Sequence, residues 1–260
     1  MTTPQDDPAG PPAVSRDAAF WAKDVSILRV GEVPAGAVNL NVTGRRVVGP
    51  IQGFGKMWQK TYRVRLAGPE VTPAEVIAAW KADFQSFWPT GNRFYGPLTG
   101  IAPGEVALLN LDMPGGLRLS TGVLVLYADG ESFTFMTPQG HMFAAWITFS
   151  AACEEEDGPV TVQAQVLLRA NDPLYEVALA IGGHRKEDLF WQQTLAAVAA
   201  RFGVQSAAVA TTVVCVDRKR QWSHAGNVWH NAAIRSGLWV AATPLRLAAR
   251  PFRARPRPPA

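Results

Sequence analysis

Cysteine is scarce in this chain, and long apolar runs are missing from it. The two cysteines, Cys153 and Cys215, lie far apart with no cysteine or histidine cluster beside either, so neither a structural disulfide nor a zinc site is expected. No window approaches the roughly 18 apolar residues that a membrane-spanning helix needs. Residues 1–17 are acidic and rich in proline, unlike a secretory signal. These features predict a cytoplasmic protein with a disordered N-terminus.

Motifs for cofactors and catalysis are also missing. Residues 44–56, GRRVVGPIQGFGK, are rich in glycine. A phosphate-binding loop would need its second glycine where Phe54 stands, and Met57 rather than serine or threonine follows Lys56. The chain has no GxSxG nucleophile motif. We therefore assign no catalytic residue, no metal and no cofactor from the sequence, and leave open whether the protein is an enzyme.

Acidic residues are nearly absent from the C-terminal part of the chain. Residues 204–260 contain nine basic side chains and one acid, Asp217, so this segment carries +8 and residues 1–203 carry −4 of the total of +4. Arginine mixed with tryptophan and leucine suits peripheral contact with an anionic membrane. Nucleic acid is a second, less favoured anionic partner. The simplest interpretation is a solvated basic extension.

Apolar and aromatic residues are plentiful. Hydrophobic residues make up 48% of the chain, with nine tryptophans and twelve phenylalanines. This composition predicts a globular protein with a substantial core. An aromatic surplus also suits a protein that encloses an apolar guest.

A strand followed by a capped helix is predicted after residue 55. Apolar residues alternate with polar ones along residues 56–66, which is typical of a strand with one solvated face. The apolar set is Trp58, Tyr62, Val64 and Leu66. Thr72, Pro73 and Glu75 form a capping-box signal, and Pro89 ends the helix.

An antiparallel meander and a long helix complete the pattern. Short turns containing Gly, Pro and Asp separate apolar segments over residues 106–169, which favours consecutive hairpins. A helix is then predicted from Pro173 to Gly203. The pair Gly182-Gly183 interrupts it at a cost of about 1 kcal/mol per glycine. We interpret this pair as a bend, with the following HRKED segment as a solvated face, rather than as the setting of a catalytic His184.

This order of elements resembles the START and polyketide-cyclase (SRPBCC) superfamily, which includes proteins of the birch-pollen-allergen type. The resemblance rests on YRVRLAGPEVTPAEVIAAWKADFQSFWP, on PQGHMFAAWITFS and on the closing RFGV, within residues 56–203. The PQGHMFAAWITFS segment is similar to an uncharacterised bacterial branch of this superfamily, to which the resemblance extends. The resemblance implies an α+β helix-grip fold, in which a curved antiparallel sheet wraps around a long C-terminal α-helix. We predict this domain at residues 18–203, with extensions at residues 1–17 and 204–260.

The resemblance also implies an internal cavity for a lipid or another hydrophobic small molecule. We predict its wall from residues on the presumed inner face: Trp58, Tyr62, Tyr127, His141, Phe143 and Trp191. The main hypothesis is non-catalytic binding. The alternatives are a cyclase or aromatase, in which His141 and a tyrosine move protons, and an interaction protein that uses its basic tail on a membrane. For His141 the simpler interpretation is a turn histidine bonded to backbone.

Overall fold

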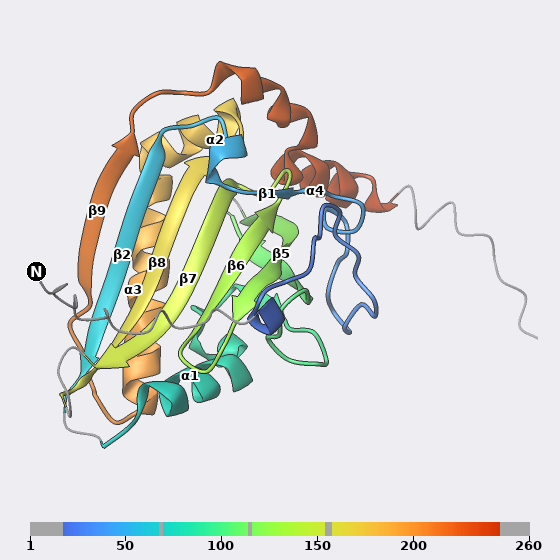
Figure 1. The fold of residues 1–260 in the computed structure, drawn as a ribbon. Helices are drawn as coiled ribbons and strands as arrows, with labels where there is room; N and C mark the ends of the chain where they lie inside the picture. The colour runs from blue at the N-terminus through green and yellow to red at the C-terminus, as the bar shows by residue number, and fades with distance from the viewer. Residues whose placement is uncertain (1–17, 68–69, 114–115, 154–157, 245–260) are drawn as a thin grey trace, which may run out of the picture.

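One antiparallel sheet dominates the computed structural model, which describes residues 18–67, 70–113, 116–153 and 158–244 (Figure 1). The strand order is β3-β4-β5-β6-β7-β8-β2-β9, with β1 paired to β6. The strands are β1 Val47–Val48, β2 Met57–Leu66, β3 Arg93–Tyr95, β4 Val106–Asp112, β5 Arg118–Ala128, β6 Ser132–Pro138, β7 Phe143–Cys153, β8 Val160–Ala170 and β9 Ala210–Asp217. The helices are α1 Pro73–Ala82, α2 Pro173–Ala178, α3 His184–Arg201 and α4 Ala232–Ala241, and the short 3-10 helices include η1 Ala18–Phe20, η2 Pro50–Gln52, η3 Phe84–Phe87 and η6 Trp222–His230.

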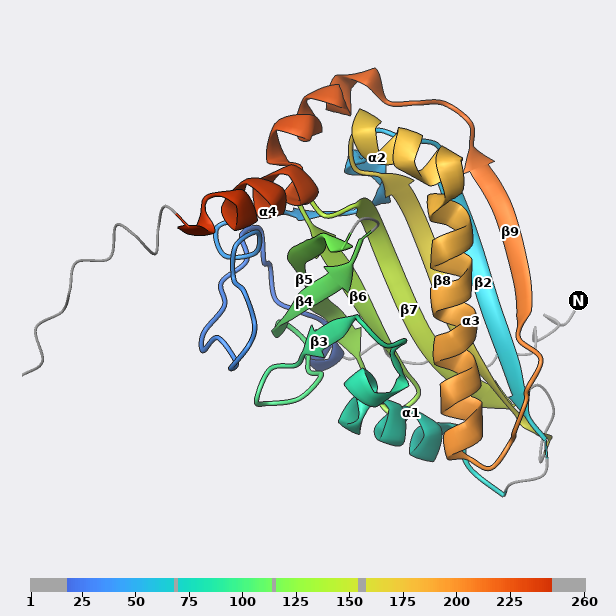
Figure 2. The same cartoon turned by 180° about the vertical axis from the view of Figure 1, so that it is seen from behind.

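The sheet curves around α3, and α1 closes the lower end of the concave face (Figure 2). This arrangement confirms the predicted helix-grip fold. The predicted capping box is also present at α1, where the Thr72 side chain accepts from the Glu75 amide. The helix ends earlier than predicted, at Ala82, and continues as η3. Phe84 and Phe87 of η3 are nevertheless buried in the core.

The predicted bend at the two glycines is confirmed. Gly182 has φ +128° and ψ −8°, and Ile181 also leaves the helical region, so a π-helical turn separates α2 from α3. Residues with a side chain rarely adopt the backbone conformation of Gly182. Asp172 begins α2 by accepting from the amides of Leu174 and Tyr175. The long helix predicted from Pro173 is therefore two helices joined at an angle.

Residues beyond 203 extend the sheet and cover one end of it. Strand β9 pairs with β2 on the side opposite β8. The chain then crosses to η6 and α4, which lie at the same end of the molecule as α2 (Figure 1). The Ala232 amide donates to the Gly140 carbonyl at 2.9 Å, and Asn41 of the N-terminal segment bonds Ser236 of α4. These elements add to those predicted for residues 18–203, whereas residues 1–17 and 245–260 lie outside the described part.

Two absences hold for the described ranges. No helix there combines the length and hydropathy that a bilayer crossing requires. No group of three or more His, Cys, Asp or Glu side chains within the same ranges could hold a metal ion.

Candidate functional site

A buried lysine lies between the sheet and the first turns of α3. Lys60 is 1% exposed, and its Nζ lies 2.9 Å from Glu187 Oε2 and 2.7 Å from Asp188 Oδ1. The same Nζ donates to the carbonyl of His184 at 3.3 Å. Tyr62 donates to Asp188 Oδ1 at 2.6 Å. We call Lys60, Tyr62, His184, Glu187 and Asp188 the grip cluster.

Two periodicities place the grip cluster. Lys60 and Tyr62 are two residues apart on β2, so their side chains leave the same face of the sheet, and Tyr62 belongs to the core cluster on that face. His184, Glu187 and Asp188 are three and four residues apart on α3, which puts them on one side of the helix. The cluster therefore forms where the inner face of β2 meets this side of α3.

The charges of the grip cluster do not balance. One lysine faces two carboxylates, so the formal charge is −1. Removing charges from water costs several kcal/mol per ion unless each is paired. Burial and the negative charge of Glu187 raise the pKa of Tyr62 far above its ordinary value, so Tyr62 stays a hydrogen-bond donor at every physiological pH.

Part of the cluster's hydrogen-bonding capacity is unused by the described residues. Glu187 is 7% exposed, and both of its carboxylate oxygens are buried without a hydrogen-bond partner. Oε2 lies within ion-pair distance of Lys60 Nζ, whereas Oε1 has no cation beside it among the described residues. His184 Nδ1 is also buried without a hydrogen-bond partner and lies 3.9 Å from Glu187 Oε2. A buried acceptor without a donor is costly and requires an explanation.

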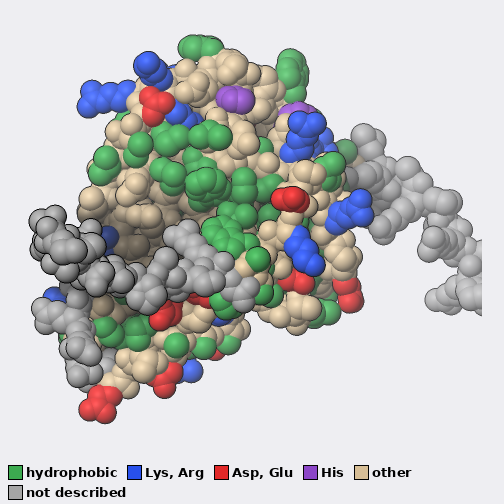
Figure 3. Space-filling view, in the orientation of Figure 1, with side chains coloured by type: hydrophobic (Ala, Val, Ile, Leu, Met, Phe, Trp, Pro, Cys, Tyr) green, Lys and Arg blue, Asp and Glu red, His purple; other side chains and the backbone are tan. Residues whose placement is uncertain are grey.

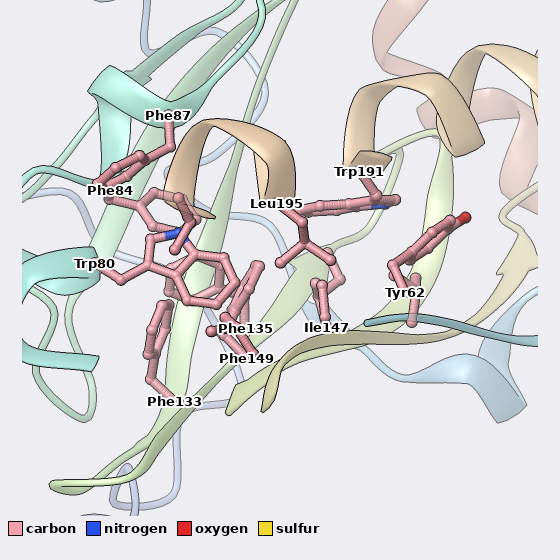
Figure 4. Close-up of a cluster of buried hydrophobic side chains, with 14 of the residues drawn as sticks. Tyr62, Trp80, Phe84, Phe87, Phe133, Phe135, Ile147, Phe149, Trp191 and Leu195 are labelled. Carbon is pink, nitrogen blue, oxygen red and sulfur yellow. The ribbon is translucent and has the colours of Figure 1, made fainter. Parts of the chain in front are cut away.

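Aromatic rings fill the space beyond the grip cluster (Figure 4). Trp191 of α3 contacts Phe149 of β7, with ring centroids 5.6 Å apart. Phe149 in turn contacts Trp80 of α1 at 5.0 Å. Leu195 and Ile147 lie between Trp80 and Tyr62, and Trp191 lies beside Tyr62 (Figure 4). Packed side chains therefore fill this part of the interior, where the sequence predicted an open cavity.

The predicted wall residues fall into two groups. Trp58, Tyr62 and Trp191 lie at or next to the grip cluster, with the Trp58 ring 5.2 Å from that of His184. Phe143 is half-buried and packs on the same core. Tyr127 lies on the other face of the sheet, because the irregular pairing after Val125 puts it opposite Thr134. Its ring lies 4.8 Å from that of Trp21, tilted by 59°, and its hydroxyl donates to Asp129.

His141 lies in the turn before β7. Its Nδ1 accepts from the Phe143 amide at 3.0 Å, and its carbonyl accepts from Asn171. Burial lowers the pKa of His141 to about 4. This is the turn histidine bonded to backbone that the sequence left as the simpler interpretation.

Two surface pockets lie away from the grip cluster. One, of about 430 Å³, is formed by residues 29–35 and by the segment 95–108. The other, of about 360 Å³, lies beside the end of α1 and the loop 96–101. Neither pocket is lined by a residue of the grip cluster.

Sequence reasoning missed Lys60, Glu187 and Asp188. The HRKED segment was predicted to be a solvated face, and Arg185 and Lys186 are indeed exposed. The prediction is wrong for Glu187, which is buried, and for Asp188, which turns toward β2. The signal was present at Lys60, which has the same parity as Trp58 and Tyr62 in the alternating strand. A lysine on the apolar face of a strand needs a buried counter-charge. Glu187 and Asp188, three and four residues after His184 on α3, supply it.

Comparison with known proteins finds similarity only among solved structures. No family model matches the chain, and no curated protein matches it. Protein Ms6760 from Mycobacterium smegmatis is 12% identical over 60% of this chain and 96% of its own, with a TM-score of 0.41. The di-domain ARO/CYC StfQ from the steffimycin biosynthetic pathway is 9% identical over 56% of this chain and 50% of its own, with a TM-score of 0.42. Ara h 8.0201 is 14% identical over 56% of this chain and 97% of its own, with a TM-score of 0.39. All three structures are at most 14% identical to this chain, with TM-scores below 0.5.

Proposed function

We propose that this chain binds a hydrophobic small molecule between the inner face of the sheet and α3, with its polar end at the grip cluster. The observation that carries the proposal is the buried Glu187 Oε1, an acceptor without a donor at the edge of an aromatic interior. Small-molecule sites combine an apolar wall with a few placed polar groups. Trp191 of the core and Trp58, whose ring lies 5.2 Å from that of His184, supply the wall.

The chemistry of the cluster limits the polar end of the ligand. Lys60 and the hydroxyl of Tyr62 are already paired with carboxylates. The groups without a hydrogen-bond partner among the described residues include Glu187 Oε1 and His184 Nδ1, in a cluster of formal charge −1. A hydroxyl or amine that donates a hydrogen bond satisfies Glu187 Oε1, whereas an anionic head group would be repelled. The ligand class is therefore an apolar molecule with a neutral or cationic donor.

Entry of the ligand requires the packed side chains to move. The π-helical turn between α2 and α3 is the irregular point of the helix that covers the sheet. Leu179 of this turn is buried in the core, while Ile181 is exposed. Displacing Leu179 by rotation about Gly182 opens the interior next to His184, the first residue of α3.

The cyclase or aromatase alternative from the sequence needs His141 beside a tyrosine. The hydrogen bonds of His141 go to Phe143 and Asn171, and a pKa of about 4 leaves it a weak base. Binding therefore remains the proposed function, and the grip cluster, rather than His141, is where any proton transfer would be sought.

Mass spectrometry tests the proposal on the protein as its own organism makes it. The intact protein is measured under native conditions and again after organic extraction. A discrete apolar molecule with a hydroxyl or amine supports the proposal. A bound molecule that carries only a carboxylate or phosphate head would contradict the assigned polar end, and a bare chain counts against an interior ligand.

A further inference from the structure

Large apolar side chains are exposed along η6 and α4. Trp222 and Trp229 of η6 are 73% and 83% exposed, and Ile234 and Leu238 of α4 are 45% and 66% exposed. Ile234 and Leu238 are four residues apart and so share one side of α4. Single exposed apolar residues are ordinary, but a group of them on adjacent elements indicates a contact surface. We call these four residues the η6–α4 surface.

The η6–α4 surface is held firmly on the domain. The Gln221 amide donates to the Phe54 carbonyl at 2.7 Å, and the Trp222 ring lies 5.2 Å from that of Phe54. Asn227 donates to the carbonyl of Asn171 at 2.9 Å. Asn231, the cap of α4, donates to Asp172 at 2.8 Å. The exposed side chains thus project from a fixed platform.

Basic residues flank this surface. Arg218, Lys219 and Arg220 immediately precede η6, and Arg235 lies on α4. Of the nearby acids, Asp217 pairs with Arg169, Glu176 pairs with Arg220, and Asp172 accepts a hydrogen bond from Asn231. The chain after α4, residues 245–260, adds five arginines and no acid. Figure 3 shows hydrophobic, Lys and Arg side chains at the end where Figure 1 places η6 and α4.

We propose that the η6–α4 surface docks on an anionic phospholipid bilayer. Tryptophan and leucine gain free energy by entering the interfacial region, while each nearby Lys or Arg gains about 1 kcal/mol from anionic head groups. Both features occur together here, on one end of the molecule. Nucleic acid would use the basic residues but leave Ile234 and Leu238 in water. This inference goes beyond the proposed ligand binding and does not depend on it.

Vesicle sedimentation of the full chain tests the inference. Vesicles contain either phosphatidylcholine alone or equal parts of phosphatidylcholine and phosphatidylglycerol. We expect binding to the anionic vesicles that weakens as NaCl rises. The double variant Trp229→Ser/Leu238→Ser should bind about tenfold more weakly. Leu98→Ser is the matched control, since Leu98 is 87% exposed on the loop between β3 and β4, and it should bind like the wild type.

Several results would overturn the inference. Wild-type protein that ignores anionic vesicles would do so directly. Unchanged binding by the double variant would move the contact away from η6 and α4, to the charged tail alone. Self-association or DNA binding without vesicle binding would assign this surface to another partner. Circular dichroism melts of both variants establish that each is folded.

Discussion

Lys60 and Glu187 form a buried ion pair, Nζ to Oε2 2.9 Å, that joins the inner face of β2 to the first turn of α3. The pair lies 127 positions apart in sequence and fixes how α3 crosses the sheet. It also leaves Glu187 Oε1 without a donor. The same contact therefore serves the fold and defines the proposed polar end of the ligand site.

Replacing Lys60 by methionine should lower the free energy of unfolding by about 3 to 5 kcal/mol, because the buried Glu187 carboxylate then loses its cation. Urea denaturation measures the loss. Lys219→Met, at an exposed position, should change stability little. The double variant Lys60→Met/Glu187→Met should be less destabilised than the sum of its single variants, and strict additivity would show that the pair does not interact.

Tyr62→Phe removes a hydrogen bond to the charged Asp188 and should cost about 1.5 to 3 kcal/mol. The raised pKa of Tyr62 adds a spectroscopic expectation. The folded pKa of Tyr62 exceeds the unfolded value of about 10. The stability that the Tyr62–Asp188 hydrogen bond contributes is therefore complete below about pH 10 and is lost as the pH rises above it. In a native alkaline titration of the four tyrosines, Tyr62→Phe should remove no amplitude below the unfolding pH. Loss of one tyrosine's absorbance there would refute the buried donor.

His141 should make the protein acid-sensitive. Its folded pKa of about 4 lies below the unfolded value of about 6.5. The stability that neutral His141 contributes to the fold is therefore complete above the unfolded pKa and is lost as the pH falls through the folded pKa. The loss is on the order of 3 kcal/mol. Denaturation curves of wild type and His141→Asn across this window measure it. Parallel curves would mean that His141 is not buried in its neutral form.

Gly182→Ala tests the bend. A Cβ at this position meets no atom within 4 Å, so the only penalty comes from the positive φ. We expect a loss of about 1 to 3 kcal/mol in unfolding free energy. Gly226→Ala is the matched control, because its Cβ also meets open space and its φ is not positive. Equal melting temperatures for the two variants would argue against the strained bend.

The fold could be predicted because its signals are local. The capping box at Thr72, the alternation along β2 and the glycine bend each depend on a few neighbouring residues. Their order along the chain then leaves few architectures to choose from.

The site could be predicted only in part, because it depends on contacts between distant segments. Trp58, Tyr62 and Trp191 were recognised as inward apolar residues. Tyr127 was misplaced because an irregularity in strand pairing reverses the face of every residue after it. Lys60 and Glu187 look like surface residues when each is considered alone, and only their pairing across β2 and α3 explains their burial.

Fluorescence titration with two probes measures whether Glu187 selects a hydrogen-bond donor on an apolar ligand. 2-Aminoanthracene and anthracene share an apolar body, and only the first donates hydrogen bonds. We expect the wild type to bind 2-aminoanthracene about tenfold more tightly than anthracene. Glu187→Met should abolish this preference, while the exposed-site control Glu131→Met should retain it. Equal affinity of the wild type for both probes, or an unchanged preference in Glu187→Met, would contradict a ligand site at the grip cluster.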